Sequence, residues 1–401
     1  MEKKVIRAAL LGLGTVGTGV YKVIKNQKEE MIPKLGSEIE ISKILVRNLE
    51  KAAAKVDDPK ILTNNWDDIV NDPEIDVVIE LIGGIEPAKT YILSALNAGK
   101  HVVSANKDLI AVHGKELLDA AEAHHVDFLF EAAVAGGIPI IRPLKECLAG
   151  NHMAEVMGIV NGTTNFILTK MTQEGMEFKD ALALATELGY AEADPTADIE
   201  GLDAGRKVAI LASVAFNSRV VFDDVYIEGI TKITPEDMQY AEELDMTIKL
   251  LGTSRKIGDD SFYAMVAPFL VGKSSPLYSV NDVFNAVFVH GNVLGDAMFY
   301  GSGAGKLPTA SAVVADVVDE AKHLHKNIMT NWSSKPLELI PMDEVEGRFF
   351  VRVEGTTVDQ VEAVFDDVEI VNLKNLPGEF GFITTKKKPG SYTHLRTHET
   401  S

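Results

Sequence analysis

Cysteine is almost absent from this chain of 401 residues, in which Cys147 stands alone. A single thiol can form neither an intrachain disulfide nor a cysteine cluster for zinc. Free cysteines are usually buried as small hydrophobic side chains, and we expect the same of Cys147. Disulfide-stapled secreted domains and zinc ribbons are therefore excluded as classes.

Long hydrophobic runs are also lacking, although hydrophobic residues make up 46% of the chain. The longest apolar stretches, such as Val77-Val78-Ile79, have the length of a strand and are too short to cross a bilayer. The N-terminus leads directly into a strand at Val5–Leu11, without the apolar core and cleavage site of a signal peptide. We therefore expect a cytoplasmic protein that does not enter the membrane.

Positive charge is scarce, with 39 lysines and arginines against 59 acidic residues and a formal net charge of −20. Such a charge repels the phosphates of nucleic acids and anionic lipid head groups. The length exceeds that of one ordinary domain. We therefore predict a multidomain protein that acts on a small molecule and binds no nucleic acid.

The first 130 residues alternate short apolar runs with amphipathic stretches, which is typical of βαβ units and a parallel sheet. We predict an α/β fold in which residues 1–135 form a Rossmann-type dinucleotide-binding domain. The expected strands are Val5–Leu11, Ile39–Val46, Val77–Leu81, His101–Ser104 and Phe128–Phe130, with helices at Pro87–Asn97 and Gly114–Ala123.

Residues 136–300 mix long helices with β-like runs, and we predict an α+β substrate domain there. Its expected elements are the strands Glu155–Val160, Val225–Ile230 and Phe262–Phe269 and the helix Lys179–Leu188. A strong amphipathic helix follows over residues 307–321, with a proline near its start.

A separate segment at residues 346–385 has the order β-α-β-β. Its expected elements are Phe349–Val353, Val358–Phe365, Glu369–Leu373 and Phe380–Thr384. The residues that follow are polar and have no apolar period, so we predict a disordered tail over residues 386–401.

A glycine-rich loop lies directly after the first strand and before a helix, in the pattern Gly12-Leu13-Gly14-Thr15-Val16-Gly17. In this context the first glycine allows a tight turn, the second lets a pyrophosphate approach the backbone, and the third permits close packing of helix and strand. The helix N-terminus offers free N–H groups to the phosphates. We predict a dinucleotide site at Gly12, Gly14, Thr15, Val16 and Gly17; the alternative is a glycine-rich turn without a ligand.

The second strand ends in Arg47, where an NAD-binding domain usually carries an acid for the ribose 2′-hydroxyl. An arginine can instead pair with a 2′-phosphate, which favours NADP. A solvated surface arginine is the alternative, and NAD stays possible.

Asp203 and Lys207 are four residues apart in an expected helix and so share one face. An exposed ion pair would explain this spacing with no functional role. Several carboxylates crowd the same segment, including Glu192 and Asp198, and indicate a polar pocket next to a core. The residues alone leave both interpretations open.

The segment from Ala185 to Lys207 resembles the signature of homoserine dehydrogenases. It shows Ala-x-x-x-Gly at residues 185–189, Asp-Pro-x-x-Asp at 194–198 and Gly-x-Asp-x-x-x-Lys at 201–207. Further matching blocks lie at residues 104–107, 131–139, 161–165 and 301–305, so the resemblance covers about residues 4–325 and weakens beyond. It implies interconversion of L-homoserine and L-aspartate 4-semialdehyde with NADP or NAD, in a homodimer or homotetramer.

The resemblance also implies residue roles. Lys207 would be the general acid/base, and Asp203 would orient it and hold the substrate amino group. Further substrate contacts are implied for Glu192, Asp198 and Lys107.

For the cofactor, the resemblance implies contacts from Lys107, for which a solvated lysine is the alternative, and from Gly305. That would make the 300–330 region part of the dinucleotide-binding domain and leave 136–300 for catalysis and dimerisation. A monovalent cation, normally sodium, would bind oxygens of Glu131, Val134, Gly136 and Ile138. A glycine hinge at this loop is a compatible alternative.

Residues 346–385 resemble the first half of an ACT regulatory module, which many members of the family carry. Two rival functions remain. Another Rossmann-headed dehydrogenase, such as the aspartate-semialdehyde enzyme, would need an activated cysteine, and the apolar flanks of Cys147 show none. A nucleotide-sensing regulator without catalysis would not need Lys107, Asp203 and Lys207.

Overall fold

The computed structural model describes residues 5–258, 261–329 and 331–389. The chain forms two compact units, each assembled from separate stretches. The first consists of Met1–Val160, Arg206–Phe222 and Phe284–Leu337, and the second of Asn161–Gly205, Asp223–Val283 and Glu338–Ser401. The chain thus returns to each unit after leaving it, and the 300–330 region, expected to complete the dinucleotide-binding domain, belongs to the first unit.

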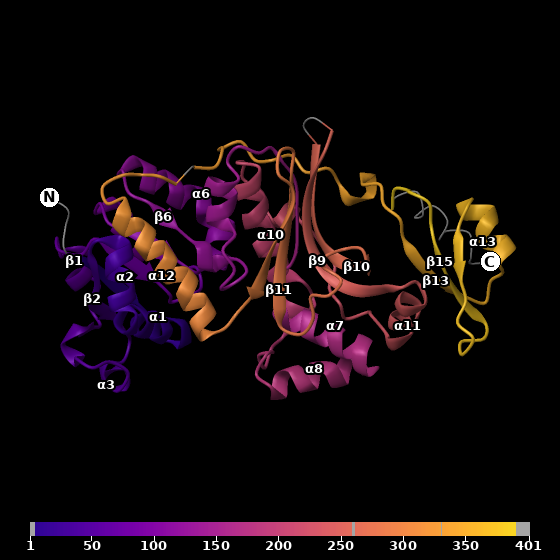
Figure 1. Cartoon of the computed structure of the whole chain (residues 1–401), viewed down its shortest axis with the longest axis horizontal. Coiled ribbons are helices and arrows are strands. Elements are labelled where there is room, and N and C mark those ends of the chain that lie inside the picture. The colour runs from indigo at the N-terminus through magenta and orange to yellow at the C-terminus, as the bar shows by residue number, and fades with distance from the viewer. Residues whose placement is uncertain (1–4, 259–260, 330, 390–401) are drawn as a thin grey trace. The chain divides into compact units, whose positions relative to one another are not determined.

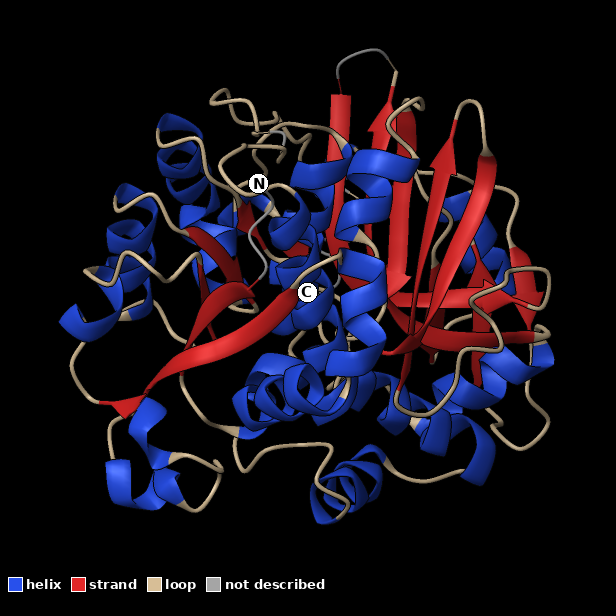
Figure 2. Cartoon of the chain, turned by 60° about the vertical axis from the view of Figure 1, so that its left-hand side comes forward, coloured by secondary structure: helices blue, strands red, loops and turns tan. Residues whose placement is uncertain are grey.

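The first unit contains a six-stranded parallel sheet in the order β3-β2-β1-β4-β5-β6 (Figure 1). Its strands are β1 (Val5–Leu11), β2 (Glu38–Leu45), β3 (Leu62–Thr63), β4 (Val77–Glu80), β5 (His101–Ser104) and β6 (Phe128–Leu129). Helices lie around this sheet, so its central strands are buried on both faces and read as continuous apolar runs (Figure 2). The predicted α/β class with a parallel sheet is confirmed.

The helices of this sheet domain include one that begins earlier than expected. They are α1 (Thr15–Asn26), α2 (Lys28–Leu35), α3 (Leu49–Ala53), α4 (Asp67–Val70), α5 (Ala88–Asn97) and α6 (Lys107–Ala123). The prediction of a start at Gly114 was wrong, because the Asn106 side chain caps α6 by accepting the N–H of Leu109 at 3.2 Å. Gly114 lies inside the helix, where a Cβ would come within 2.7 Å of the ring of Trp332.

Helix α12 (Lys306–Lys322) packs against α1, although almost three hundred residues separate them (Figure 1). A Cβ on Gly19 of α1 would lie 2.7 Å from the carbonyl oxygen of Lys306, so the two backbones are in direct contact. The same unit holds three antiparallel strands, β7 (Met153–Ile159), β11 (Phe284–Gly291) and β12 (Gly295–Ser302).

The second unit combines antiparallel strands with helices. Its elements include α7 (Gly162–Glu174), α8 (Phe178–Glu187), α9 (Thr196–Ile199), β8 (Tyr226–Ile227), α11 (Pro235–Glu243), β9 (Met246–Ile257) and β10 (Ser261–Gly272). Helix α10 (Leu202–Ala215) carries residues of both units. Strand β9 was not predicted, because eight consecutive residues of it are buried and the alternation expected of a half-exposed strand is absent.

The C-terminal segment forms a three-stranded antiparallel sheet in the order β13-β15-β14. Its elements are β13 (Phe350–Glu354), α13 (Val358–Phe365), β14 (Glu369–Val371) and β15 (Glu379–Ile383). Helix α13 covers one face of the sheet, where its Val361 belongs to the same core cluster as Phe380 and Phe382 of β15.

The other face of this small sheet packs on α11 of the same unit. The rings of Tyr240 and Phe350 lie 5.3 Å apart, and Arg352 contacts Asp237 at 2.8 Å and Glu379 at 3.0 Å. A half module would leave one apolar face uncovered, and here α11 covers that face.

Backbone pairing extends beyond the last strand, because Lys387 and Gly347 exchange two hydrogen bonds of 2.9 and 3.0 Å. Ordered structure thus continues to residue 389, and the rest of the expected tail lies outside the described residues. Cys147 is exposed, so the expectation of a buried thiol was wrong. Within the described ranges, none of the helices has the length and apolar character of a membrane span.

Candidate active site

The glycine-rich loop has the backbone geometry that a pyrophosphate site requires. Gly12 has a φ of +94°, a region that disfavours side chains, and a Cβ on Gly17 would lie 2.2 Å from the carbonyl oxygen of Gly12. Around Gly14, by contrast, a Cβ would meet nothing within 4 Å, so the loop is open on the side that faces a ligand. Gly14 is the N-cap of α1, and Thr15 and Val16 form its first turn.

A cavity of about 580 Å³ opens beside this loop at the carboxyl ends of β1, β2 and β4. Three cationic side chains line it: Arg47, Lys51 and Lys55. The Lys55 ammonium donates to the carbonyl oxygen of Leu13 at 2.8 Å, which ties this basic group to the phosphate loop. Arg47 is exposed at the end of β2, where the sequence placed it, and the cavity has the size and charge for a dinucleotide.

Two buried polar side chains shape the same edge of the sheet further along. The Glu80 carboxylate accepts the N–H of Ile82 at 2.7 Å and the hydroxyl of Ser104 at 2.7 Å. The Asn106 amide donates to the carbonyl oxygen of Gly84 at 2.6 Å. These contacts fix the loops after β4 and β5, so Lys107 stands half-buried as the first residue of α6 at this edge.

Helix α10 carries the two residues expected to do the chemistry. Asp203 is buried, with 6% of its surface exposed, and Lys207 follows one turn later and is half-buried. The Lys207 ammonium donates to the carbonyl oxygen of Val160 at 2.7 Å. The pair is therefore no exposed ion pair, because burial and a main-chain acceptor restrain both side chains.

Asn161 joins two of the predicted acidic residues and was not itself predicted. Its amide donates to Asp198 at 2.7 Å and to Asp203 at 2.9 Å, while its side-chain oxygen caps α7 by accepting the N–H of Thr164 at 2.9 Å. The capping pattern is visible in the sequence, but the contacts to acids 37 and 42 residues away are not. Glu192 is exposed in the loop before α9.

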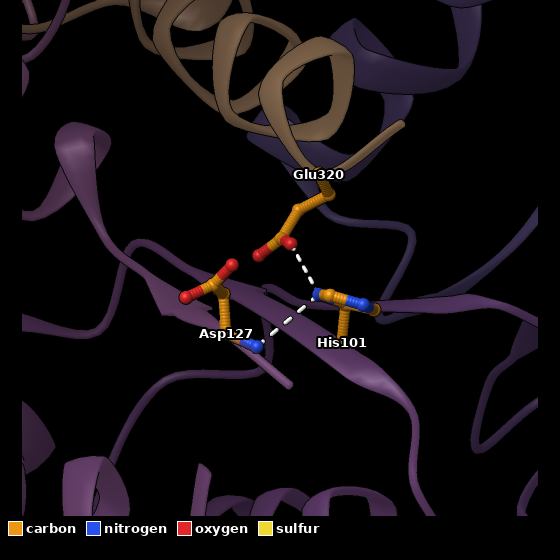
Figure 3. A group of neighbouring side chains, drawn as sticks. All are labelled: His101, Asp127 and Glu320. Carbon is orange, nitrogen blue, oxygen red and sulfur yellow. Dashed lines mark hydrogen bonds and ion pairs between the residues drawn. The ribbon is translucent and has the colours of Figure 1, made fainter. Parts of the chain in front are cut away.

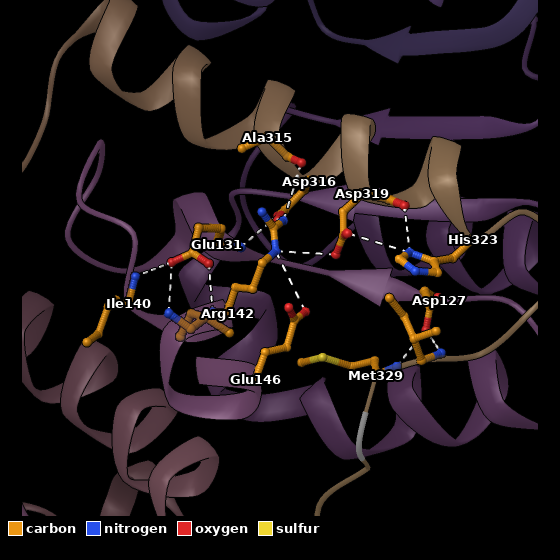
Figure 4. Close-up of polar contacts among 12 residues, drawn as sticks. Asp127, Glu131, Ile140, Arg142, Glu146, Ala315, Asp316, Asp319, His323 and Met329 are labelled. Carbon is orange, nitrogen blue, oxygen red and sulfur yellow. Dashed lines mark hydrogen bonds and ion pairs between the residues drawn. The ribbon is translucent and has the colours of Figure 1, made fainter. Parts of the chain in front are cut away.

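The expected cation loop, residues 131–138, is buried and sharply bent. Ala135 and Gly136 have φ values of +56° and +55°. Both carboxylate oxygens of Glu131 accept backbone N–H groups, from Ile141 at 2.7 Å and Arg142 at 2.8 Å among others (Figure 4). The Glu131 side chain thus holds the first N–H groups of the helical turn that follows the loop, and its carbonyl oxygen accepts the N–H of Val134 at 3.5 Å.

The carbonyl oxygens of this loop fit a hard cation better than the carboxylate does. Among the described residues, the backbone hydrogen bonds leave the carbonyl oxygens of Val134, Gly136 and Ile138 without a donor. Buried carbonyl groups without donors are uncommon, and sodium-like ions prefer oxygen ligands of this kind.

A second buried cluster has the composition of a metal site. His101, Asp127 and Glu320 each offer one ligand atom, all within 4.8 Å of one another (Figure 3). His101 Nδ1 forms an ion pair with Glu320, and its Nε2 lies 3.2 Å from the N–H of His325.

A proton suits this cluster better than a metal. Burial raises the pKa of Glu320 well above its usual range, and the nearby Asp127 raises it further. Both ring nitrogens of His101 also accept backbone N–H groups, Nδ1 from Asp127 at 3.1 Å and Nε2 from His325 at 3.2 Å, whereas a metal would need a bare lone pair. The cluster is therefore a buried polar core at the amino end of β5, opposite the cavity, where burial favours the neutral form of Glu320.

Comparison with known proteins places the whole site in a family context. The family profile described as homoserine dehydrogenase matches residues 139–318, and the one described as its NAD-binding domain matches residues 12–131. Homoserine dehydrogenase of Bacillus subtilis is 48% identical over 329 residues, which are 82% of this chain and 76% of the relative. That of Corynebacterium glutamicum is 50% identical over 319 residues, which are 79% and 72%.

Solved structures agree with these matches. The crystal structure of a homoserine dehydrogenase from Thiobacillus denitrificans has a TM-score of 0.89 and 41% identity, and covers 98% of this chain and 94% of that one. A hyperthermophilic archaeal homoserine dehydrogenase in complex with NADPH has a TM-score of 0.68 and 27% identity, covering 79% and 97%.

Proposed function

The chain belongs to the homoserine dehydrogenase family, and from that premise we propose which of its residues bind and which transfer the proton. It is an oxidoreductase of amino-acid biosynthesis that interconverts L-homoserine and L-aspartate 4-semialdehyde with a nicotinamide dinucleotide. Membership of this family sets aside the two rival functions, another Rossmann-headed dehydrogenase and a nucleotide-sensing regulator without catalysis. One observation supports the residue roles: α10 holds a buried carboxylate and a restrained lysine one turn apart.

Lys207 is the general acid/base in this proposal. A nicotinamide dinucleotide, when bound, would supply the hydride acceptor for carbon 4 of homoserine. Lys207 takes the proton from the 4-hydroxyl oxygen as that carbon becomes a carbonyl. In the reductive direction Lys207 returns the proton to the same oxygen. Asp203, fixed by Asn161, holds the substrate ammonium together with Glu192 and Asp198.

Lys107 binds at the junction of cofactor and substrate in this proposal, since α6 starts at the carboxyl edge of the sheet. The cofactor also contacts the 12–17 loop and Gly305, which is the N-cap of α12. NADP is the preferred coenzyme because Arg47, Lys51 and Lys55 line one cavity and can face a 2′-phosphate. Oxygens of Glu131, Val134, Gly136 and Ile138 would hold a sodium-type cation.

We also propose that the enzyme is a homodimer or homotetramer in the cytoplasm. Strand β12 lies at the edge of its sheet and exposes Met298 and Tyr300, with Phe284 stacked 5.3 Å from Tyr300. An exposed apolar edge strand is a typical subunit contact. A single exposed cysteine suits a reducing compartment.

The proton-transfer role is tested by Lys207→Ala. We expect kcat for homoserine oxidation to fall by roughly two to four orders of magnitude, as for loss of a general acid/base, with the Kd for NADPH nearly unchanged. Arg206→Gln is the matched control, because Arg206 is a cation on the same helix but pairs with Asp108 at 3.0 Å. A loss in Lys207→Ala below about tenfold, or an equal loss in the control, would show that Lys207 is not the acid/base.

A further inference from the structure

The cation loop touches the start of α12 through backbone atoms. Gly137 donates its N–H to the carbonyl oxygen of Ser302 at 3.1 Å. A Cβ on Gly136 would lie 2.2 Å from the carbonyl oxygen of Gly303, and one on Gly137 would lie 2.7 Å from Pro308. Contacts this close leave no room for sliding, so residues 136–137 and 302–308 must move together.

A second set of contacts ties the beginning of the loop to the third turn of α12 (Figure 4). The carboxylate of Asp316, only 2% exposed, accepts the N–H of Glu131 at 2.8 Å and the guanidinium of Arg142 at 2.7 Å. Glu131 in turn caps the backbone at Ile141 and Arg142. The cation loop is therefore anchored on α12 at both of its ends.

The same helix also meets the dinucleotide site. Gly305, with a φ of +119°, forms its N-cap, and the first turn lies against α1, where Gly19 faces Lys306 and Ala310. Helix α1 begins at the phosphate loop. A displacement of α12 would consequently shift Gly305 and the helix that receives the pyrophosphate.

We propose that cation binding and dinucleotide binding are thermodynamically linked through α12, and that Asp316 is the positioning residue of this link. The inference rests on the proposed cation site. Without a cation, the buried carbonyl oxygens of Val134, Gly136 and Ile138 repel one another, and the loop shifts and carries residues 302–308 with it. With a cation they converge, and the loop holds the start of α12 in place for the cofactor.

Linkage is reciprocal: the cation raises the affinity for the dinucleotide by the same factor as the dinucleotide raises that for the cation. Couplings between sites are commonly about 5- to 150-fold, and we expect the Kd for NADPH to be at least about fivefold lower in sodium. NADPH fluorescence measures this Kd for the full chain, in sodium chloride and in choline chloride of equal ionic strength. Equal ionic strength removes the general effect of screening.

Two variants one turn apart on α12 separate Asp316 from a general charge effect. Asp319→Ala also removes a partner of Arg142, at 3.2 Å, but Asp319 does not accept the Glu131 N–H. In Asp316→Ala we expect the ratio of the Kd values in the two salts to approach one, and in Asp319→Ala to stay near the wild-type ratio. Asp316→Leu fills the site without accepting the Glu131 N–H, and the same loss of linkage is expected of it if the alanine variant does not fold.

Broadening of the sodium-23 resonance reports cation binding by itself. If the sodium-23 resonance broadens but the Kd for NADPH is equal in the two salts, the cation binds and the linkage is refuted. No broadening at all would refute the cation site and the linkage with it. Equal loss of linkage in Asp316→Ala and Asp319→Ala would show that the charge around Arg142, and not the bond to Glu131, is responsible.

Discussion

Replacing Arg47 by aspartate should move the coenzyme preference from NADP towards NAD. The guanidinium is exposed at the rim of the cavity beside the phosphate loop, within reach of a ribose 2′-substituent. A hydrogen-bonded ion pair between Arg47 and the 2′-phosphate would contribute about 2 kcal/mol to the binding of NADP. We take this moderate value because solvent screens the charge of an exposed side chain. A carboxylate in its place repels the 2′-phosphate by about 1 kcal/mol at roughly 4 Å in water.

The new carboxylate also accepts the 2′-hydroxyl of NAD, which adds about 1 kcal/mol. Together these effects amount to about 4 kcal/mol, or roughly 1000-fold in the ratio of kcat/KM for NADP to that for NAD. Lys51 and Lys55 remain and retain part of the phosphate affinity, so we expect a change between about 30-fold and 1000-fold.

Initial rates of homoserine oxidation with each coenzyme measure this ratio. Lys22→Asp is the matched control, because it makes the same change of net charge at an exposed position of α1 that does not line the cavity. A change of less than about threefold in Arg47→Asp, or an equal change in Lys22→Asp, would refute a role of Arg47 in coenzyme choice.

Two further predictions concern stability. A stop codon after Glu346 removes the C-terminal sheet and uncovers the buried Tyr240. We therefore expect the free energy of unfolding, measured by thermal unfolding, to fall by about 2–4 kcal/mol, while kcat stays within a few-fold. An unchanged Tm would contradict the packing of this sheet on α11. In Glu320→Gln we expect a higher Tm than in the wild type, and we expect this difference in Tm to grow as the pH rises from 5 to 9. The reason is that folding raises the pKa of Glu320, so the wild type loses stability once the unfolded chain ionises this carboxyl. A difference in Tm that does not depend on pH would contradict a raised pKa of Glu320.

The sequence predicted the parallel sheet well for a physical reason. Strands β1 and β5 have the predicted bounds, because strands buried on both faces are apolar runs that end where the chain reaches polar residues. The start of α6 was missed because Gly114 looks like a helix boundary. Only the approach of Trp332, more than two hundred residues away, explains a glycine inside that helix.

The site was predictable where it follows from local pattern and not where it depends on distant contacts. The glycine loop and the end of β2 belong to short segments, so Gly12, Gly17 and Arg47 lie where the sequence placed them. The role of Asn161 was not predicted, because its partners Asp198 and Asp203 lie about forty residues further along the chain. The capping role of Glu131 escaped it too, since the accepted amides become neighbours only through the bend of the 131–138 loop.

The packing of α12 on α1 has a consequence for synthesis of the chain on the ribosome. When α1 and the parallel sheet have emerged, the surface around Gly19 that α12 covers is still bare, and it stays so until about three quarters of the protein has been made. The side of α1 that α12 covers in the finished protein is thus open to its surroundings for most of translation. A chaperone that recognises exposed apolar surface would meet its substrate there, before the last helix of the unit closes it.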